Sequence, residues 1–507
     1  MTETISGMIA AAKDDAPAIG APGRDWMDYA GLKRLGTEVA ATLHAAGIGR
    51  GDRVAIVLPN GPEMAAAFLT IAQWATTAPL NPAYREEEFG FYLEDLKARA
   101  IVLPEGADGP ALSAARRFDL PVLWLTADPD AAAGRFTLRA ESAGTPADTA
   151  APRADDTALI LHTSGTTSRP KIVPLLQSNV TASARNVAAA LALSPADRCL
   201  NVMPLFHIHG LIAALLASVA AGAQIVCTPG FDALRFFAWL DAARPTWYTA
   251  VPTMHQAILA RAPRNEAVLE RVSLRFLRSS SASLPPQVFA ELAACFDAPV
   301  IEAYGMTEAA HQMCSNPLPP EAQKPGAVGR AAGPEVRIAD EADDRLVDGI
   351  GEVVISGPNV TPGYEANPEA NAKSFFEADG RRWFRTGDQG GFDADGYLSL
   401  TGRLKEIINR GGEKISPLEV DAVLMDHAAV AQVVCFALPH PSLGEDVAAA
   451  VVLRDGAQAS EEEIRHFAAT RLAAFKVPRK VLIVGEIPKG ATGKMQRIGM
   501  AEKLGLA

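Results

Sequence analysis

The first four hundred residues alternate short β-rich runs with longer stretches of helical pattern. "RVAIVLP" (53–59) is followed by "PEMAAAFLTIAQWA" (62–75), and "EEEFGFYLEDLKA" (86–98) is followed by "AIVLP" (100–104). Short apolar runs of this kind fit buried strands, and their alternation with helices is typical of layered sheets covered by helices. We therefore expect an α/β protein with a large N-terminal domain of helix-covered sheets.

The sequence pattern changes after Gly351. Short β-like runs separated by Asp-Gly and Gly-Gly pairs, as in "GFDADGYLSLTG" (391–402), indicate a β-rich subdomain. Further on, residues 418–438 show a helix followed by a strand, and residues 461–475 show another helix. We predict an N-terminal domain over residues 1–402 and a small, mobile α+β domain over residues 403–507.

Composition restricts the partners. A net charge of -12 argues against nucleic acid, because phosphate backbones are bound by basic surfaces. The five cysteines are dispersed, which fits a reducing cytoplasm better than a disulfide framework. The apolar stretch 210–227 is diluted by Ala, Gly and Gln, so it predicts a buried helix, turn and strand and no membrane span. We find neither a secretory signal nor a C-terminal SKL address and expect a cytoplasmic protein of undetermined oligomeric state.

A strand candidate, "DTALILHT" (156–163), runs directly into a loop rich in hydroxyl groups. Residues 163–170, "TSGTTSRP", contain five Ser or Thr side chains, and Lys171 follows them. Hydroxyls and inward-turned backbone amides can surround phosphate oxygens. The P-loop pattern is not met, because Pro170 stands where the second glycine is required. On composition alone an ordinary Ser/Thr-rich turn remains an alternative.

Four other motifs favour the phosphate-binding interpretation of this loop. They are "NVMPLFHIHG" (201–210), "EAYGMTEAAH" (302–311), "RTGDQGGFDADGYLSLTGRLKEIINRGGEKISPLEVD" (385–421) and "PKGATGKMQR" (488–497). With the hydroxyl-rich loop, and in this order, they resemble the adenylate-forming superfamily of acyl-CoA synthetases, adenylation domains and luciferases. The resemblance implies that a carboxylate attacks the α-phosphorus of ATP, releasing pyrophosphate, and that a thiol then displaces AMP from the acyl-adenylate.

The resemblance also implies roles for single residues. The loop would hold the β- and γ-phosphates while Glu308 binds Mg²⁺, so that both offset charge on the leaving pyrophosphate. Asp388 would accept hydrogen bonds from the ribose hydroxyls, and Lys494 would reach the reacting carboxylate from the small domain. The expected catalytic residues are Lys494, Thr307 and Glu308. The residues expected to bind ATP are Thr163, Ser164, Gly165, Thr166, Thr167, Lys171, Glu302, Tyr304, Thr307, Asp388, Arg403 and Lys494.

Further implied roles concern the second half-reaction. Lys405 falls at the family's hinge position, about which the small domain would rotate between the two steps. After that rotation Gly411, Gly412 and Lys414 would face the thiol of CoA. ATP, Mg²⁺ and CoA are thus the expected small-molecule partners, together with a carboxylic acid.

The acid pocket is expected to be polar. His207 and His209 are two residues apart, on one face if the segment is extended, and His311 lies four beyond Thr307. Three histidines could complement an additional carboxylate. Taken singly each fits a structural histidine, and a zinc site has less support because no fourth ligand is evident.

Three segments resemble the oxalyl-CoA synthetase subgroup more closely: "TWYTAVPTMHQAIL" (246–259), "RFLRSSSASLPP" (275–286) and "EAYGMTEAAHQMCSNPLPP" (302–320). That resemblance implies that Ser281, His209 and His311 hold the distal carboxylate of oxalate. The alternatives are a synthetase for another short acid, such as malonate or a small hydroxy acid, and an adenylation enzyme that loads a carrier protein. A non-catalytic nucleotide-binding protein is a third alternative.

Overall fold

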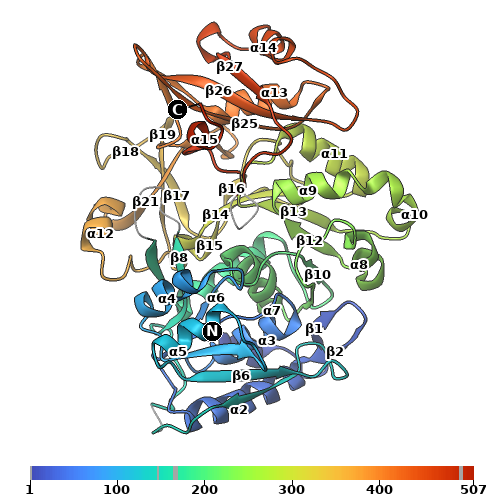
Figure 1. Ribbon diagram of the computed structural model, residues 1–507, viewed down its shortest axis with the longest axis vertical. Coiled ribbons are helices and arrows are strands. Elements are labelled where there is room, and N and C mark those ends of the chain that lie inside the picture. Colours follow the sequence, from blue (N-terminus) through green and yellow to red (C-terminus); the bar gives the residue numbers. More distant parts are fainter. Residues whose placement is uncertain (1–2, 146–147, 164–169, 490–494, 507) are drawn as a thin grey trace.

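The computed structural model describes residues 3–145, 148–163, 170–489 and 495–506, which contain four sheets (Figure 1). Two large, mostly parallel sheets form the lower and middle parts, a β-rich subdomain lies beside the second, and the C-terminal residues lie at the top. None of the helices in the described part of the chain is long and apolar enough to cross a membrane.

The first large sheet has seven strands. In spatial order they are β7 (Phe136–Ala140), β6 (Val122–Ala127), β5 (Ala100–Pro104), β3 (Arg53–Ile56), β4 (Thr76–Pro79), β8 (Thr157–Thr163) and β9 (Lys171–Leu176). Side chains alternate between its faces, so Val54 and Ile56 enter one core cluster and Ala55 enters another. The first face is covered by α2 (Tyr29–Ala45) and α3 (Pro62–Ile71), the second by α4 (Glu86–Asp95) and α5 (Pro110–Arg117).

The second large sheet has nine strands. In spatial order they are β16 (Arg330–Ala331), β15 (His311–Ser315), β14 (Val300–Met306), β13 (Phe276–Ser280), β12 (Trp247–Ala250), β10 (Arg198–Asn201), β11 (Gln224–Cys227), β1 (Pro17–Ala21) and β2 (Arg24–Asp28). The helices toward the first sheet include α1 (Ile5–Ala11), α6 (Gln177–Ala190), the π-helix η1 (His209–Leu216) and α7 (Ala217–Ala220). On the opposite side are α8 (Phe236–Ala243), α9 (Pro252–Leu259), η2 (Ala262–Arg264), α10 (Glu266–Leu269) and α11 (Pro286–Phe296). The largest core cluster thus lies between the two sheets.

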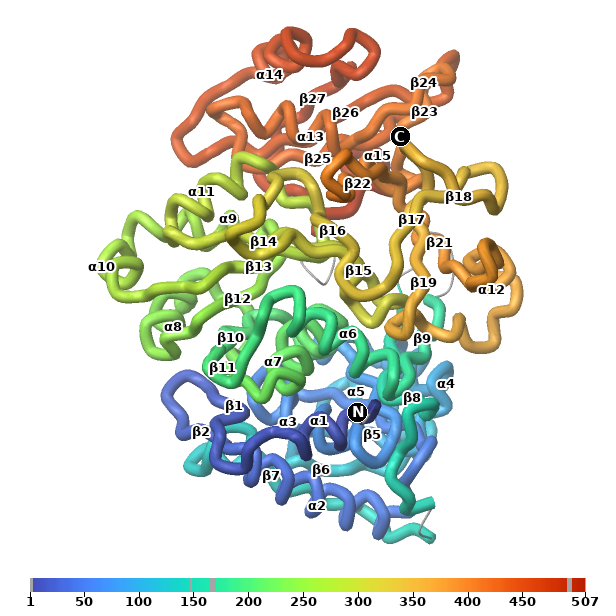
Figure 2. Tube along the Cα trace, turned by 180° about the vertical axis from the view of Figure 1, so that it is seen from behind, coloured from blue at the N-terminus to red at the C-terminus, as the bar shows by residue number. Residues whose placement is uncertain are grey.

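The β-rich subdomain is antiparallel throughout. Its strands are β18 (Leu346–Val347), β17 (Glu335–Ala339), β19 (Ile350–Ser356), β21 (Arg381–Phe392), β20 (Phe375–Ala378) and β22 (Leu398–Arg403), with α12 (Pro368–Ser374) at its side. The sheet changes between β22 and β23, close to the predicted boundary. The view from behind shows the same order of layers (Figure 2).

The C-terminal sheet contains β24 (Glu413–Ile415), β23 (Ile408–Arg410), β26 (Gly444–Leu453), β25 (Val430–His440) and β27 (Lys480–Ile483). Its helices are α13 (Pro417–Met425), α14 (Glu461–Ala469), η4 (Ala474–Lys476) and α15 (Met500–Lys503). Ser460 caps α14, since its hydroxyl accepts the Glu463 amide at 3.1 Å, in agreement with the predicted helix start. The α/β class with a β-rich subdomain and a small α+β domain is therefore confirmed.

Candidate active site

The candidate site lies where two parallel neighbours, β13 and β14, end. Their register pairs Ser279 with Glu302 and Ser280 with Ala303, so the segments that follow them emerge at the same edge of the sheet. That edge is the usual place for ligands in sheets of this type. The short 3₁₀ turn η3 (Thr307–Ala309) carries Thr307 and Glu308 directly after β14.

The hydroxyl-rich loop connects two paired strands. Thr163 ends β8, Lys171 begins β9, and the two residues are partners in the antiparallel ladder. The loop therefore leaves and re-enters the sheet at one point, as a turn that cradles phosphate requires. Its predicted residues Ser164, Gly165, Thr166 and Thr167 lie outside the described residues, as does Lys494.

Asp388 is held between a tyrosine and an arginine. The Tyr304 hydroxyl donates a hydrogen bond to its Oδ2, and Arg403 Nε lies 3.3 Å from its Oδ1. Pairing of β21 with β22 places Asp388 opposite Arg403, so the contact follows from strand register. The Asp388 charge raises the pKa of Arg403, and burial, together with that same charge, raises the pKa of Tyr304. Three residues predicted to bind ATP are thus in direct contact.

Glu308 forms a second polar group. It is buried, and its Oε1 accepts a hydrogen bond of 2.8 Å from Tyr364, whose ring lies 4.2 Å from Lys171 Nζ. Burial raises the pKa of Glu308 above its ordinary value. A buried carboxylate beside a lysine suits a divalent cation with phosphate oxygens, because Mg²⁺ prefers oxygen ligands and few protein carboxylates. Tyr364 was not predicted, and no sequence signal marked it.

Glu302 is also buried. Its Oε1 accepts the Leu284 amide at 3.0 Å, whereas its Oε2 has no hydrogen-bond partner among the described residues. Burial raises its pKa to about 8. Glu302 and Tyr304 both lie on β14, with Tyr304 two residues further along the strand. The Glu302 carboxyl group is therefore at the same edge of the sheet as Tyr304.

The three residues predicted to bind the acid come together. His209 Nδ1 lies 3.1 Å from Ser281 Oγ, and the rings of His209 and His311 are 5.1 Å apart. Ser281 and His311 have φ values of 76° and 101°, a region that non-glycine residues seldom adopt. Such strain concentrates at ligand sites. Gly305 allows the close approach of this turn, because a Cβ there would lie 1.8 Å from the His311 carbonyl oxygen.

The segment that carries His207 and His209 is not extended, so the condition for a shared strand face is not met. Residues 205–207 form a turn and bend, and His209 begins η1, so the two-residue spacing does not align the rings. Instead His207 Nδ1 accepts the backbone amide of His209 at 3.3 Å. Within the described ranges, no group of three or more His, Cys, Asp or Glu side chains is arranged to hold a metal ion.

The comparisons with known proteins agree with this geometry. Residues 8–365 match the model of the AMP-binding enzyme family, and residues 419–494 match that of the AMP-binding enzyme C-terminal domain. The chain belongs to the AMP-binding enzyme family. The oxalate–CoA ligase of Arabidopsis thaliana is 45% identical over 98% of both chains. That of Saccharomyces cerevisiae is 43% identical over 89% of this chain and 87% of its own.

A solved structure is similar over nearly the whole chain. ATP-bound MatB from Rhodopseudomonas palustris is 30% identical, covers 99% of both chains and superposes with a TM-score of 0.89. The apo form of the same protein gives 0.80.

One of the predicted CoA residues of this AMP-binding enzyme contacts the β-rich subdomain. Lys414 pairs with Glu341 in the turn between β17 and β18, and this ion pair lowers the pKa of Glu341. Gly411 and Gly412, both with positive φ, form the turn between β23 and β24. Lys405 is exposed in the turn between β22 and β23, where the chain passes from one sheet to the next.

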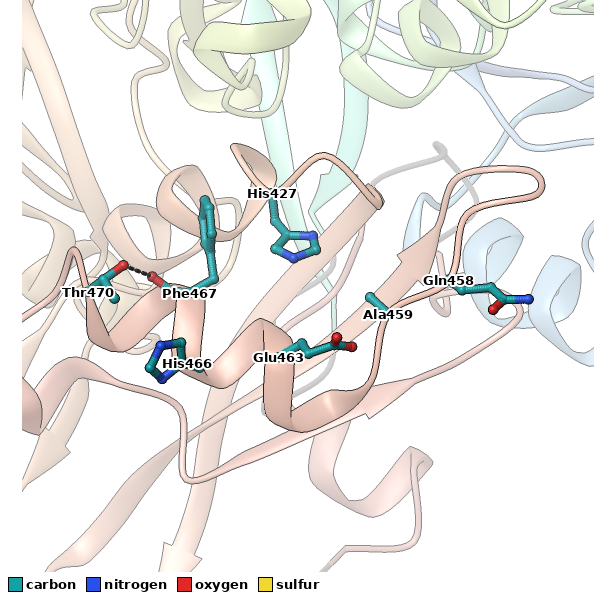
Figure 3. Close-up of a pocket in the computed structure, with 7 residues that line it drawn as sticks. All are labelled: His427, Gln458, Ala459, Glu463, His466, Phe467 and Thr470. Carbon is teal, nitrogen blue, oxygen red and sulfur yellow. Dashed lines mark hydrogen bonds between the residues drawn. The ribbon is translucent and has the colours of Figure 1, made fainter.

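A hollow of about 330 Å³ lies beside α14 (Figure 3). Side chains of α14 form one wall of it. The lining residues are His427, Gln458, Ala459, Glu463, His466, Phe467 and Thr470. None of them is a predicted site residue, so we assign it no part in the reaction.

Proposed function

We propose that the chain is an ATP-dependent oxalate–CoA ligase, which converts oxalate, ATP and CoA to oxalyl-CoA, AMP and pyrophosphate. The contact of Ser281 with His209, beside the ring of His311, carries this proposal. Synthetases for fatty or aryl acids need an apolar pocket, whereas these three polar side chains suit a second carboxylate. The 45% identity to the oxalate–CoA ligase of Arabidopsis thaliana supports the same acid.

The chemistry proceeds in two displacements. An oxalate oxygen forms a bond to the α-phosphorus of ATP as the bond to pyrophosphate breaks. The sulfur of CoA, having lost its proton, then attacks the acyl carbon, and the carbon–oxygen bond to AMP breaks. AMP is a stable anion that leaves readily, whereas a free carboxylate has no comparable leaving group.

The residues at the strand ends would bind and orient ATP for this attack. Asp388 would accept hydrogen bonds from the ribose hydroxyls, and Lys171 would add positive charge beside the phosphates. Glu308 would hold Mg²⁺ with phosphate oxygens. Bound there, Mg²⁺ would neutralise charge on the leaving pyrophosphate.

We further propose that residues 403–507 rotate about Lys405 between the two displacements. Lys494 would act in the first displacement, and Gly411, Gly412 and Lys414 would face CoA in the second. Such a rotation would break the ion pair of Lys414 with Glu341 on the β-rich subdomain and release Lys414 for CoA. A cytoplasmic location is part of the proposal and has its support in the cysteines, all five of which are free.

The test is release of AMP and pyrophosphate from Mg²⁺-ATP with a panel of acids, each with and without CoA. The panel contains oxalate, malonate, acetate, benzoate and a medium-chain fatty acid. Turnover that depends on CoA and is greatest with oxalate is expected. Turnover with a monocarboxylate alone would overturn the choice of acid, and turnover that needs a phosphopantetheinylated carrier protein in place of CoA would identify a carrier-loading enzyme.

A further inference from the structure

An arginine lies completely buried behind the acid pocket. Arg278, on β13, is 0% exposed, and no carboxylate within the described ranges pairs with it. Its Nη2 donates to Gln312 Oε1 at 3.4 Å, and its Nε has no hydrogen-bond partner among the described residues. Burial lowers its pKa to about 9, which leaves it charged at neutral pH. A buried charge without a counter-ion is costly to fold and calls for an anionic ligand or a positioning role.

The strand register places Arg278 beside Thr249, and both residues contact His209. Arg278 on β13 is the ladder partner of Thr249 on β12, so the two side chains lie next to each other. Both reach the same ring atom: His209 Nε2 is 2.6 Å from Thr249 Oγ1 and 3.4 Å from Arg278 Nη1. A guanidinium group has only donors, so Nε2 beside it must act as an acceptor.

This contact fixes the proton on the other side of the ring. With Nε2 accepting, the neutral imidazole carries its hydrogen on Nδ1, which lies 3.1 Å from Ser281 Oγ. The Nδ1–H group therefore donates to the serine oxygen. The hydroxyl hydrogen of Ser281 is then directed away from His209 and can be donated to an anion in the pocket.

We propose that Arg278 is a positioning residue for acid selection: it holds His209 in the Nδ1–H form, so that Ser281 donates its hydroxyl hydrogen to the distal carboxylate. This inference rests on the proposed function and deepens it. The positive charge of Arg278 also favours a dianionic acid, because a charge acts more strongly across a buried site than through water. A neutral hydroxyl in place of the second carboxylate accepts only a weaker, uncharged hydrogen bond from Ser281 and gains nothing from the charge of Arg278.

The experiment compares oxalate with glycolate, in which a hydroxyl replaces the distal carboxylate. In Arg278→Met the KM for oxalate is expected to rise roughly 10- to 100-fold, the range for loss of a hydrogen bond to a charged group, while the KM for ATP changes little. The preference for oxalate over glycolate, as kcat/KM, should fall by the same factor. Arg278→Lys keeps a buried cation and should retain part of the preference.

The matched control is Arg275→Met. Arg275 precedes the same strand, but its Nε pairs with Asp197 at 3.0 Å, away from the pocket. This control removes one arginine and one ion pair without touching His209, so the oxalate preference should persist. Calorimetric titration with ATP shows that each variant is folded, and Arg278→Gln replaces the methionine variant if that variant does not fold.

A second readout does not depend on the acid. In protein with ¹⁵N-labelled histidine, the His209 ring should be protonated at Nδ1 in the parent and lose that fixed state in Arg278→Met. An Nε2-protonated ring in the parent, or an unchanged oxalate preference in folded Arg278→Met, would overturn the role of Arg278. A parent enzyme inactive on oxalate, with His209 still protonated at Nδ1, would instead overturn only the choice of acid.

Discussion

Glu302 makes the stability of the large domain depend on pH in a defined direction. Burial raises the pKa of this carboxyl from 4.5 to about 8. Below the lower value Glu302 is protonated in both the folded and the unfolded chain. Between the two values the unfolded chain loses the proton and the folded chain keeps it, so the folded state loses stability as pH rises. Above about 8 both forms are ionised and the loss is constant.

The substitution Glu302→Gln removes this titration while keeping the shape and the acceptor for the Leu284 amide. Each pH unit between the two pKa values lowers the free energy of unfolding of the parent by about 1.4 kcal/mol. The variant should therefore gain roughly 3 kcal/mol of stability relative to the parent between about pH 5 and pH 7. Over the full pH range between the two pKa values, the gain in stability should reach about 5 kcal/mol.

Urea unfolding without ATP, followed at several pH values, measures this difference. Glu270→Gln, the same charge change at an exposed position of the large domain, serves as the control. Curves for Glu302→Gln and the parent that stay parallel from about pH 5 to pH 8 would show that Glu302 ionises normally in the folded chain, and would refute the reasoning.

Three further variants test the proposed roles. Lys494→Ala should abolish pyrophosphate release while the protein still converts supplied acyl-adenylate to thioester; adenylation at the parent rate would exclude this lysine from the first step. Tyr364→Phe removes the hydrogen bond to Glu308 and should raise the KM for Mg²⁺-ATP about 10-fold or more in steady-state assays, since such a bond to a charged group contributes about 1.5–3 kcal/mol. Glu341→Gln breaks an exposed ion pair with Lys414 worth at most about 1 kcal/mol, so the rate of thioester formation should change less than about 5-fold and adenylation not at all.

The sequence predicts local elements well because their patterns are local. The helical pattern of residues 178–193 agrees with α6, which occupies Gln177–Ala190. Residues 210–227 form the predicted buried helix, turn and strand as η1, α7 and β11. The contact of Asp388 with Arg403 joins two residues of one motif, and the short β21–β22 connection keeps them together.

The remaining features depend on distant parts of the chain. Arg278 in "RFLRSSS" has the pattern of a strand with a polar face, and its burial requires η1 and β15 to cover it. The positive φ of Ser281 and His311 carries no mark in the sequence, because neither residue is glycine. Tyr364 reaches Glu308 across 56 residues, and nothing in the sequence relates the two.

The most direct test of the proposed reaction follows an oxygen atom. With oxalate labelled by ¹⁸O, Mg²⁺-ATP and CoA, mass spectrometry should find oxalyl-CoA, and each AMP formed should contain one ¹⁸O atom in its phosphate. The label reaches AMP because the oxalate oxygen that attacks the α-phosphorus leaves with AMP when the thiol attacks the acyl carbon. AMP formed without the label, or labelled AMP without oxalyl-CoA, would contradict the proposed ligase.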